Sequence, residues 1–482
     1  MLIENATLAD GTRRDVRVAG ERITAVDPVG SLDPDGDERV VDATGKRLLP
    51  GMIDVHVHFR QPGFGHKETW KTGTRSAAAG GVTTVVDQPN TDPPTIDGPG
   101  YDVKADYAAE AVVDYGINGG VTPEWDSSEL FDRPIFALGE VFLADSTGDM
   151  GIDGTLFTTA LEEASDNDTT VTVHAEDASL FNESARERTD ADAWSAYRRA
   201  RAEREAIRRA CALARDRGMS IHIAHTSTPS GIDLAAEAGM TCEVTPHHLF
   251  LSRGDLSELG THGRMNPPLR RERLRQGVYD RVVDGTVDMI ATDHAPHTAQ
   301  EKAAGIWEAP SGVPGVETAL PLLLVEARDG NLSYERVRNL TATNPAETFG
   351  LPDRGRVAVG AYADLVLVDP DRVETIRAEG LHTKCDWTPF EGWDGIFPEW
   401  TMVRGTLVYD HDTEEPFGEH RGRNVRIDDE GATAGTATGT EEQSSTTKKQ
   451  SSTTEKQSST TEKQSSTTEK QSSTAKESSD DE

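Results

Sequence analysis

The segment Gly51-Met-Ile-Asp54-Val-His56-Val-His58-Phe-Arg60 combines an apolar run with two histidines that are one residue apart. Side chains alternate between the two faces of a strand, so His56 and His58 point the same way. A near-continuous apolar run is typical of a strand that is buried on both faces of a parallel sheet. Residues 51–59 therefore predict a buried parallel strand whose end presents two imidazoles, a pair able to bind one divalent metal.

The rest of the chain repeats this strand pattern and alternates it with helix-like segments such as 191–217, which are rich in Ala, Arg and Glu. Alternating strands and helices indicate a parallel sheet. Eight such units fit a closed (β/α)8 TIM barrel of the α/β class better than an open sheet. Besides 51–59, the expected barrel strands are 82–87, 117–121, 135–142, 170–174, 220–225, 241–245 and 287–292.

The barrel is expected to span residues 49–354 and to have two flanks of different character. Residues 1–48 and 355–427 carry short strand-like pieces broken by Gly, Asp and Pro, and we expect them to pair into one small β-sandwich domain. From residue 428 the composition collapses, and the unit QSSTTEK repeats without an apolar seam. We expect residues 428–482 to be a disordered tail.

Composition narrows the class of function. The chain has 84 acidic and 49 basic residues and a formal charge of −35, which argues against a nucleic-acid partner. Lysine is scarce before the tail, which we interpret as adaptation to a halophilic, high-salt cytoplasm. The three cysteines lack CxxC spacing and are expected to be buried free thiols. Neither a signal peptide nor an apolar stretch of about 18 residues is visible, so we expect a cytoplasmic protein without a membrane partner.

Three more metal-binding side chains stand at or just after predicted strand ends. His174 ends 170–174, His225 ends 220–225, and Asp293 follows 287–292. The ends of barrel strands converge at one mouth, where the catalytic residues of such enzymes lie. Four histidines and an aspartate at strand ends therefore predict a metal site rather than packing.

Two longer motifs make a family resemblance specific. The segment DVHVHFRQPG at 54–63 is followed by Lys67-Glu68-Thr69, and ATDHAPH at 291–297 is followed by Lys302. Together with segments 243–249, 265–270, 311–318 and 364–369, they resemble the dihydroorotases, cyclic amidohydrolases of the amidohydrolase superfamily. The resemblance covers roughly residues 1–427 and excludes the tail.

The resemblance implies a reaction and its metal ligands. His56, His58 and Asp293 would hold one metal and His174 and His225 a second, about two Zn²⁺ per chain, although manganese, cobalt or iron stay open. A metal-bound hydroxide would attack the ring amide of dihydroorotate, with Asp293 as general acid and base. The product would be N-carbamoyl-L-aspartate, and pyrimidine biosynthesis would run the reaction backwards.

The resemblance also implies substrate-binding residues and a homodimer. Arg60 points to the same side as His58 and would pair with the substrate carboxylate. Asn90, Asn266, His297 and the backbone near Gly312 would complete the substrate site.

One position departs from the family pattern. Many members bridge their metals with a carboxylated lysine at the end of strand four, where this chain has Glu140. The bridge would be Glu140, which we favour, or Asp145 or water, and a site with one tightly held metal is also open.

Three other functions compete with dihydroorotase. Allantoinases and hydantoinases or dihydropyrimidinases share the metal ligands, but Arg60 and the APH run favour a substrate with its own carboxylate. A silent dihydroorotase-like subunit that scaffolds a partner such as aspartate transcarbamoylase would be expected to lose ligands. All four histidines and Asp293 are present, which argues against it.

Overall fold

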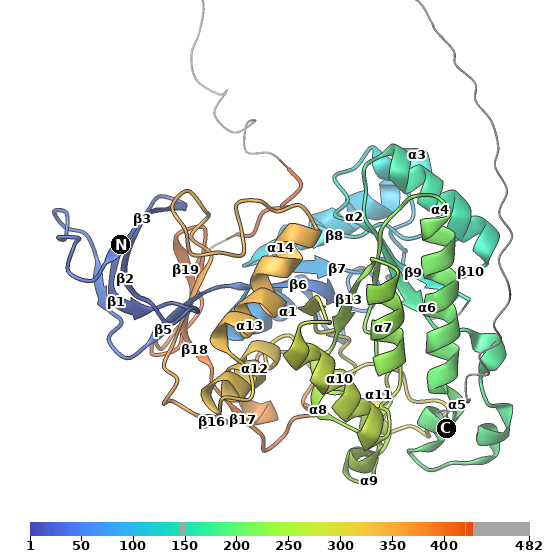
Figure 1. The fold of residues 1–482 in the computed structure, drawn as a ribbon. Coiled ribbons are helices and arrows are strands. Elements are labelled where there is room, and N and C mark those ends of the chain that lie inside the picture. The colour runs from blue at the N-terminus through green and yellow to red at the C-terminus, as the bar shows by residue number, and fades with distance from the viewer. Residues whose placement is uncertain (145–149, 420, 428–482) are drawn as a thin grey trace, which may run out of the picture. The chain divides into compact units, whose positions relative to one another are not determined.

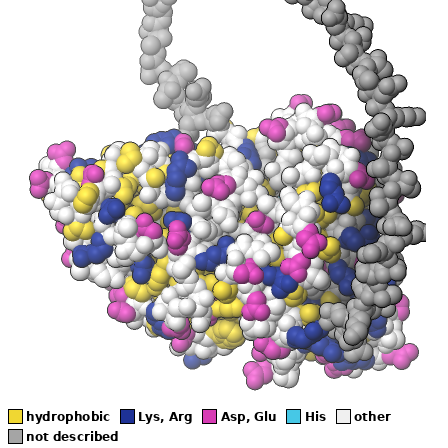
Figure 2. All heavy atoms as spheres, viewed as in Figure 1, with side chains coloured by type: hydrophobic (Ala, Val, Ile, Leu, Met, Phe, Trp, Pro, Cys, Tyr) yellow, Lys and Arg dark blue, Asp and Glu magenta, His cyan; other side chains and the backbone are white. Residues whose placement is uncertain are grey.

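The computed structural model describes residues 1–144, 150–419 and 421–427, which belong to one unit, Met1–Ile427. The predicted tail, 428–482, and Asp145 lie outside the described residues. Among the described residues, no helix has both the length and the apolar character that a membrane crossing requires. On the face shown in Figure 2, acidic and basic side chains are intermixed.

Eight parallel strands form a closed ring. Strands β6 to β8 pair in sequence order, and so do β9, β11, β12, β13 and β14. Parallel bridges from Gly119 to Leu138 and from Val57 to His294 join the two sets. The short strand β10 (Gly151–Ile152) extends β9 at the rim. The ring consists of β6 (Met52–Val57), β7 (Val82–Asp87), β8 (Asp114–Ile117), β9 (Leu138–Leu143), β11 (Val171–Ala175), β12 (Ile221–Ile223), β13 (Thr241–Val244) and β14 (Met289–Ile290).

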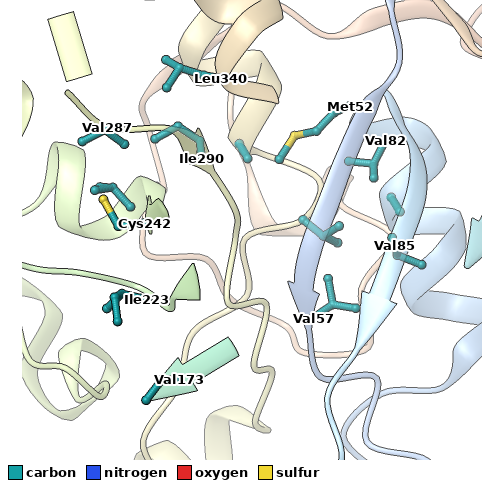
Figure 3. Close-up of a cluster of buried hydrophobic side chains, with 14 of the residues drawn as sticks. Met52, Val57, Val82, Val85, Val173, Ile223, Cys242, Val287, Ile290 and Leu340 are labelled. Atoms are coloured by element: carbon teal, nitrogen blue, oxygen red, sulfur yellow. The ribbon is translucent and has the colours of Figure 1, made fainter. Parts of the chain in front are cut away.

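Helices surround this ring and bury its outer face (Figure 1). Every residue of β6, β7, β9 and β11 is buried, as expected for strands covered on both faces. Figure 3 shows part of the resulting core, with side chains from several strands such as Val57, Val85, Val173 and Ile290. The helices are α1 (Trp70–Ala79), α2 (Gly98–Ala108), α3 (Ser127–Phe131), α4 (Gly154–Asp166), α5 (Ala193–Tyr197), α6 (Ala200–Arg215), α7 (Pro229–Glu237), α8 (Pro246–Phe250), α9 (Leu256–Leu259), α10 (Glu272–Asp284), α11 (Ala299–Lys302), α12 (Ala319–Arg328), α13 (Tyr334–Arg338) and α14 (Asn344–Thr348).

The helix expected over 191–217 is divided into α5 and α6. The break falls at Arg198 and Arg199, where Arg199 has extended backbone angles (φ −66°, ψ 151°). The buried Arg198 guanidinium binds the carboxylate of Glu176 at 2.6 Å. In α6 the buried residues recur every three or four positions, among them Ala202, Ala206 and Ala210, so that one face packs on the barrel.

Both flanks of the barrel contribute to a second sheet. Strand β5 of the N-terminal flank pairs antiparallel with β15 of the C-terminal flank, which joins them. All eight strands form one sheet, so a two-layer β-sandwich is not confirmed, and the boundaries expected near residues 48 and 354 stay predictions. The strands are β1 (Leu2–Thr7), β2 (Arg13–Ala19), β3 (Arg22–Pro28), β4 (Val40–Asp42), β5 (Arg47–Pro50), β15 (Leu365–Val368), β18 (Pro398–Val403) and β19 (Thr406–Asp410), and β16 (Glu374–Thr375) and β17 (Asp394–Gly395) form a separate pair.

A buried charge network connects this sheet to the barrel. Asp114, the first residue of β8, binds Arg354 at 2.6 Å and Arg404 at 2.9 Å. Arg354 also binds Asp364 at 2.6 Å. Although burial opposes it, the charges of Arg354 and Arg404 lower the pKa of Asp114. The network therefore fixes the flanks against the strand that begins at Asp114.

Candidate metal centre and substrate pocket

The structure brings together the side chains that the sequence places at strand ends. His56 lies in β6, Glu140 in β9 and His174 in β11. His58, His225 and Asp293 directly follow or lie close to the ends of β6, β12 and β14. All six are buried. Because parallel strands of a barrel end on the same side, they meet at one mouth.

Two overlapping groups of these residues have ligand atoms close enough to hold a metal: His56, His58 and Asp293, and His56, Glu140 and His225. In the first, His58 Nε2 lies 3.0 Å and His56 Nε2 3.6 Å from Asp293 Oδ1. The imidazoles of the first group therefore converge on the Asp293 carboxylate.

The two oxygens of the Glu140 carboxylate contact different histidines. Its Oε2 is 3.5 Å from His56 Nε2, whereas its Oε1 is 2.5 Å from His225 Nε2 and 2.9 Å from His174 Nδ1. Its backbone N–H donates to Gln88 Oε1 at 2.8 Å, which helps to position this residue. One carboxylate thus faces histidines from three strands, the arrangement that a bridging ligand requires.

The residues fit a divalent metal. His56 Nε2 is buried and makes no hydrogen bond to any described residue, although two carboxylates lie just beyond hydrogen-bond range. A buried polar atom without a partner is unfavourable, and a coordinated cation would remove that cost. Neutral imidazoles and carboxylates are the ligands that zinc and similar transition metals take in proteins.

Hydrogen bonds from residues outside the ligand set fix the ring orientations of His56 and His58. His56 Nδ1 lies 2.6 Å from Glu243 Oε1, and His58 Nδ1 lies 2.8 Å from Asn90 Oδ1. Glu243 Oε1 also accepts from the backbone N–H of His225 at 3.2 Å. A hydrogen bond at Nδ1 leaves Nε2 as the metal-facing nitrogen of both rings.

A second outer carboxylate contacts His174. Glu176 Oε2 is 3.4 Å from His174 Nε2 and 2.6 Å from the guanidinium of Arg198. Sequence reasoning missed Glu176 and Glu243. The available signal was an acidic residue inside or beside an otherwise apolar strand, since Glu243 stands between Cys242 and Val244.

Charges within the cluster shift the pKa values of its members. Burial alone would raise the pKa of Glu140, but His225 and His56 hold it well below its usual range. Burial likewise opposes protonation of His56, but Glu243 and Glu140 raise its pKa well above the usual value. The cluster is therefore an environment that favours a buried positive charge beside its carboxylates.

Three of the predicted site residues have left-handed backbone angles, which side-chain-bearing residues rarely adopt. The φ angles are 66° for Arg60, 32° for His225 and 45° for Asp293. Such strain collects at functional sites, where the surrounding structure maintains it.

A pocket opens over the metal ligands. Its lining includes Glu140, His174, His225 and Asp293, and also four residues predicted to bind substrate: Arg60, Asn90, Asn266 and Gly312. His297 does not line it. Instead, its ring contacts two residues that do line the pocket: Nε2 lies 3.1 Å from the Arg60 guanidinium and 2.9 Å from the carbonyl oxygen of Ser311.

Among the described residues that line this pocket, Arg60 is the one with a permanently cationic side chain. Its Nε donates to the carbonyl oxygen of Pro296 at 3.2 Å, and burial lowers its pKa to about 10. It forms no ion pair with a described carboxylate. A buried guanidinium that stays charged and has no ion-pair partner among the described residues is suited to bind an anionic group of a ligand.

Comparison with known proteins agrees with this geometry. Residues 47–408 match the amidohydrolase family, and the chain belongs to that family. Within it, the chain is 62% identical to a dihydroorotase of Halobacterium salinarum, over 88% of this chain and 99% of the relative. It is 41% identical to a dihydroorotase of Methanosarcina mazei, over 82% of this chain and 90% of the relative. These relatives place it among the dihydroorotases.

Solved structures of cyclic amide hydrolases share the fold. An L-hydantoinase from Arthrobacter aurescens superimposes with a TM-score of 0.83 at 27% identity, over 88% of this chain and 98% of that one. A dihydropyrimidinase from Brevibacillus agri gives a TM-score of 0.81 at 29% identity, with the same coverage. The TM-scores agree with the TIM-barrel architecture.

Proposed function

We propose that this chain is a dihydroorotase, which interconverts (S)-dihydroorotate and N-carbamoyl-L-aspartate in pyrimidine biosynthesis. The observation that carries the proposal is the position of Arg60 in the same pocket as the metal-ligand cluster. Dihydroorotate carries a cyclic amide and a carboxylate, so it needs a hydrolytic centre and a cation side by side. The two dihydroorotase relatives support the same assignment.

The pocket residues would orient the substrate by its carboxylate. Arg60 offers a guanidinium fork that matches a carboxylate in two hydrogen bonds. Asn90 lines the same pocket, and its Oδ1 is engaged by His58, which leaves its amide N–H groups to donate. Asn266 and the backbone of Gly312 border the remaining space. These contacts would place the ring amide over Asp293.

Asp293 is the proposed general acid and base. A divalent metal, when bound here, would lower the pKa of a coordinated water and polarise the amide carbonyl. The Asp293 carboxylate would accept the proton of the attacking water and deliver it to the leaving ring nitrogen. Burial raises the pKa of Asp293, but His58 and His56 more than offset this and lower it, which keeps the base ionised.

For the metals, we propose about two Zn²⁺ per chain. His56, His58 and Asp293 would hold one and His174 and His225 the other, with Glu140 as the bridge. The group of His56, His58 and Asp293 supports the first set of ligands, and the contacts of Glu140 with His56, His174 and His225 support the bridge. Asp145 lies outside the described residues, so its part as an alternative stays a prediction.

Several finer proposals rest on the sequence. The excess of acidic over basic residues and the scarcity of lysine support a cytoplasmic enzyme of a high-salt cell. A homodimer, and the absence of nucleic-acid and membrane partners, also remain proposals. His297 would contribute to substrate binding through its contact with the Arg60 guanidinium.

Hydantoinase or dihydropyrimidinase activity is the second candidate, favoured by the similarity to those solved structures. The test compares dihydroorotate with hydantoin, dihydrouracil and allantoin on the metal-loaded protein in high salt. Turnover of dihydroorotate alone supports the proposal. Turnover of an uncharged ring alone would contradict it and the role of Arg60, and bound metal without any turnover would indicate a silent subunit.

A further inference from the structure

Next to the pocket, the ring of His297 lies between two cations, Lys67 and Arg60. His297 Nδ1 is 3.1 Å from the ammonium nitrogen of Lys67, and His297 Nε2 is 3.1 Å from Nη2 of Arg60. Nε2 is also 2.9 Å from the carbonyl oxygen of Ser311. Lys67 is 3.3 Å from Glu301 and its side chain is 14% exposed, so it is a largely buried, charge-paired ammonium.

The neutral imidazole has one N–H, which cannot serve all three neighbours. An ammonium and a guanidinium can only donate hydrogen bonds, and a carbonyl oxygen can only accept. If Lys67 donates to Nδ1, the ring proton is on Nε2 and is donated to Ser311. Burial, followed by the charges of Arg60, Lys67 and Lys302, lowers the pKa of His297, in keeping with a neutral ring.

This tautomer decides what Arg60 can do. With a proton on Nε2, the ring offers Arg60 no acceptor, and the 3.1 Å contact sets two N–H groups against each other, which favours turning Nη2 of Arg60 toward the pocket that Arg60 and Ser311 line. With the proton on Nδ1, Nε2 would accept a hydrogen bond from Arg60 and hold its guanidinium against the His297 ring. Ser311 would then lose its donor.

We propose that Lys67 is a positioning residue for substrate binding, because its contact with His297 Nδ1 selects the tautomer that leaves Arg60 available to the substrate carboxylate. The inference rests on the proposed function, since it takes dihydroorotate as the substrate. Lys67 does not line the pocket, so it acts through His297 and Arg60.

The test compares Lys67→Met and Lys67→Arg with wild type, all in the full-length, metal-loaded protein. Lys71→Met is the matched control, because Lys71 is an exposed lysine four residues further on, in α1. Steady-state kinetics with dihydroorotate gives kcat and KM separately. Titration with orotate, which has a similar ring and the same carboxylate, gives a dissociation constant without turnover. Ring ¹⁵N shifts of His297, assigned with His297→Asn, report the tautomer.

For Lys67→Met we expect KM and the orotate dissociation constant to rise about 10- to 100-fold, as for loss of a hydrogen bond to a charged group. We expect kcat to change far less, and the His297 proton to move from Nε2 to Nδ1. Lys67→Arg keeps a cationic donor and should recover most of the affinity, and Lys71→Met should match wild type.

The proposal would be overturned by a wild-type His297 protonated on Nδ1, or by a Lys67→Met protein whose orotate affinity and tautomer equal those of wild type. If Lys71→Met lost as much orotate affinity, the effect would come from overall charge, and this would also contradict the proposal. Failure of the proposed function is distinguishable, because wild type itself would then not turn over dihydroorotate.

Discussion

Glu243 offers a sharp test of how the metal centre is built. Its Oε1 lies 2.6 Å from His56 Nδ1 and accepts from the backbone N–H of His225 at 3.2 Å, so one oxygen supports two candidate ligands. Its Oε2 lies 3.1 Å from His222 Nε2. We predict that Glu243→Gln and Glu243→Ala weaken metal binding although neither removes a ligand.

The expected size follows from what each variant loses. Loss of an outer partner of a metal-binding histidine costs about 10- to 100-fold in metal affinity, or about 1.4–2.7 kcal/mol. Glu243→Gln keeps an acceptor for His56 and loses the charge, so we expect about tenfold. Glu243→Ala loses the contacts with His56, His225 and His222, so we expect about 100-fold.

The assay is competition for Zn²⁺ between the protein and a chromophoric chelator, with folding checked by circular dichroism. Glu317→Gln is the matched control, because Glu317 is a buried carboxylate 2.7 Å from the ring of His382 and contacts none of the candidate ligands. Zinc affinities equal to wild type in both Glu243 variants would refute the reasoning. So would an equal loss in Glu317→Gln.

Three further predictions concern catalysis, specificity and stability. Asp293→Asn should lower kcat for dihydroorotate by at least about 10³-fold, because the general base is lost; a fall under tenfold would assign that role elsewhere. Arg60→Lys should raise KM about tenfold with little change in kcat, because a point charge replaces a two-bond fork; an unchanged KM would count against Arg60 as the carboxylate partner. Asp114→Asn should lower the free energy of unfolding by about 3–5 kcal/mol in denaturant titrations, because Arg354 and Arg404 lose the buried negative charge that they share and Asp364 remains for Arg354 alone; a loss below about 1 kcal/mol would show that the charge of Asp114 contributes little.

Much of the fold could be predicted because its signals are local. Apolar runs such as 82–87 mark buried strands, and that run coincides with β7. The third strand is different: the structure starts β8 at Asp114, earlier than the predicted 117–121. A charged residue argues against a buried strand unless it is paired, and the partners of Asp114, Arg354 and Arg404, lie 240 and 290 residues away. No local pattern reveals them.

Some residues of the candidate site could also be predicted from the sequence, and others could not. His56, His58 and Asp293 could be found because strand ends carry function in a barrel, and the structure brings them together. The contacts of Glu243 and Glu176 could not be found from the sequence, because they depend on which side chain of a neighbouring strand reaches which ring nitrogen. The position of His297 behind Arg60 is also a tertiary result, since the sequence alone gives no reason to separate the two.

The most direct test of the central claim follows dihydroorotate hydrolysis and carbamoyl-aspartate cyclisation by the purified protein in high salt, with metal content measured on the same sample. We expect metal-dependent turnover in both directions, with about two metals per chain and no turnover of hydantoin, dihydrouracil or allantoin. Bound metal without turnover of dihydroorotate, or turnover of an uncharged ring in its place, would contradict the account.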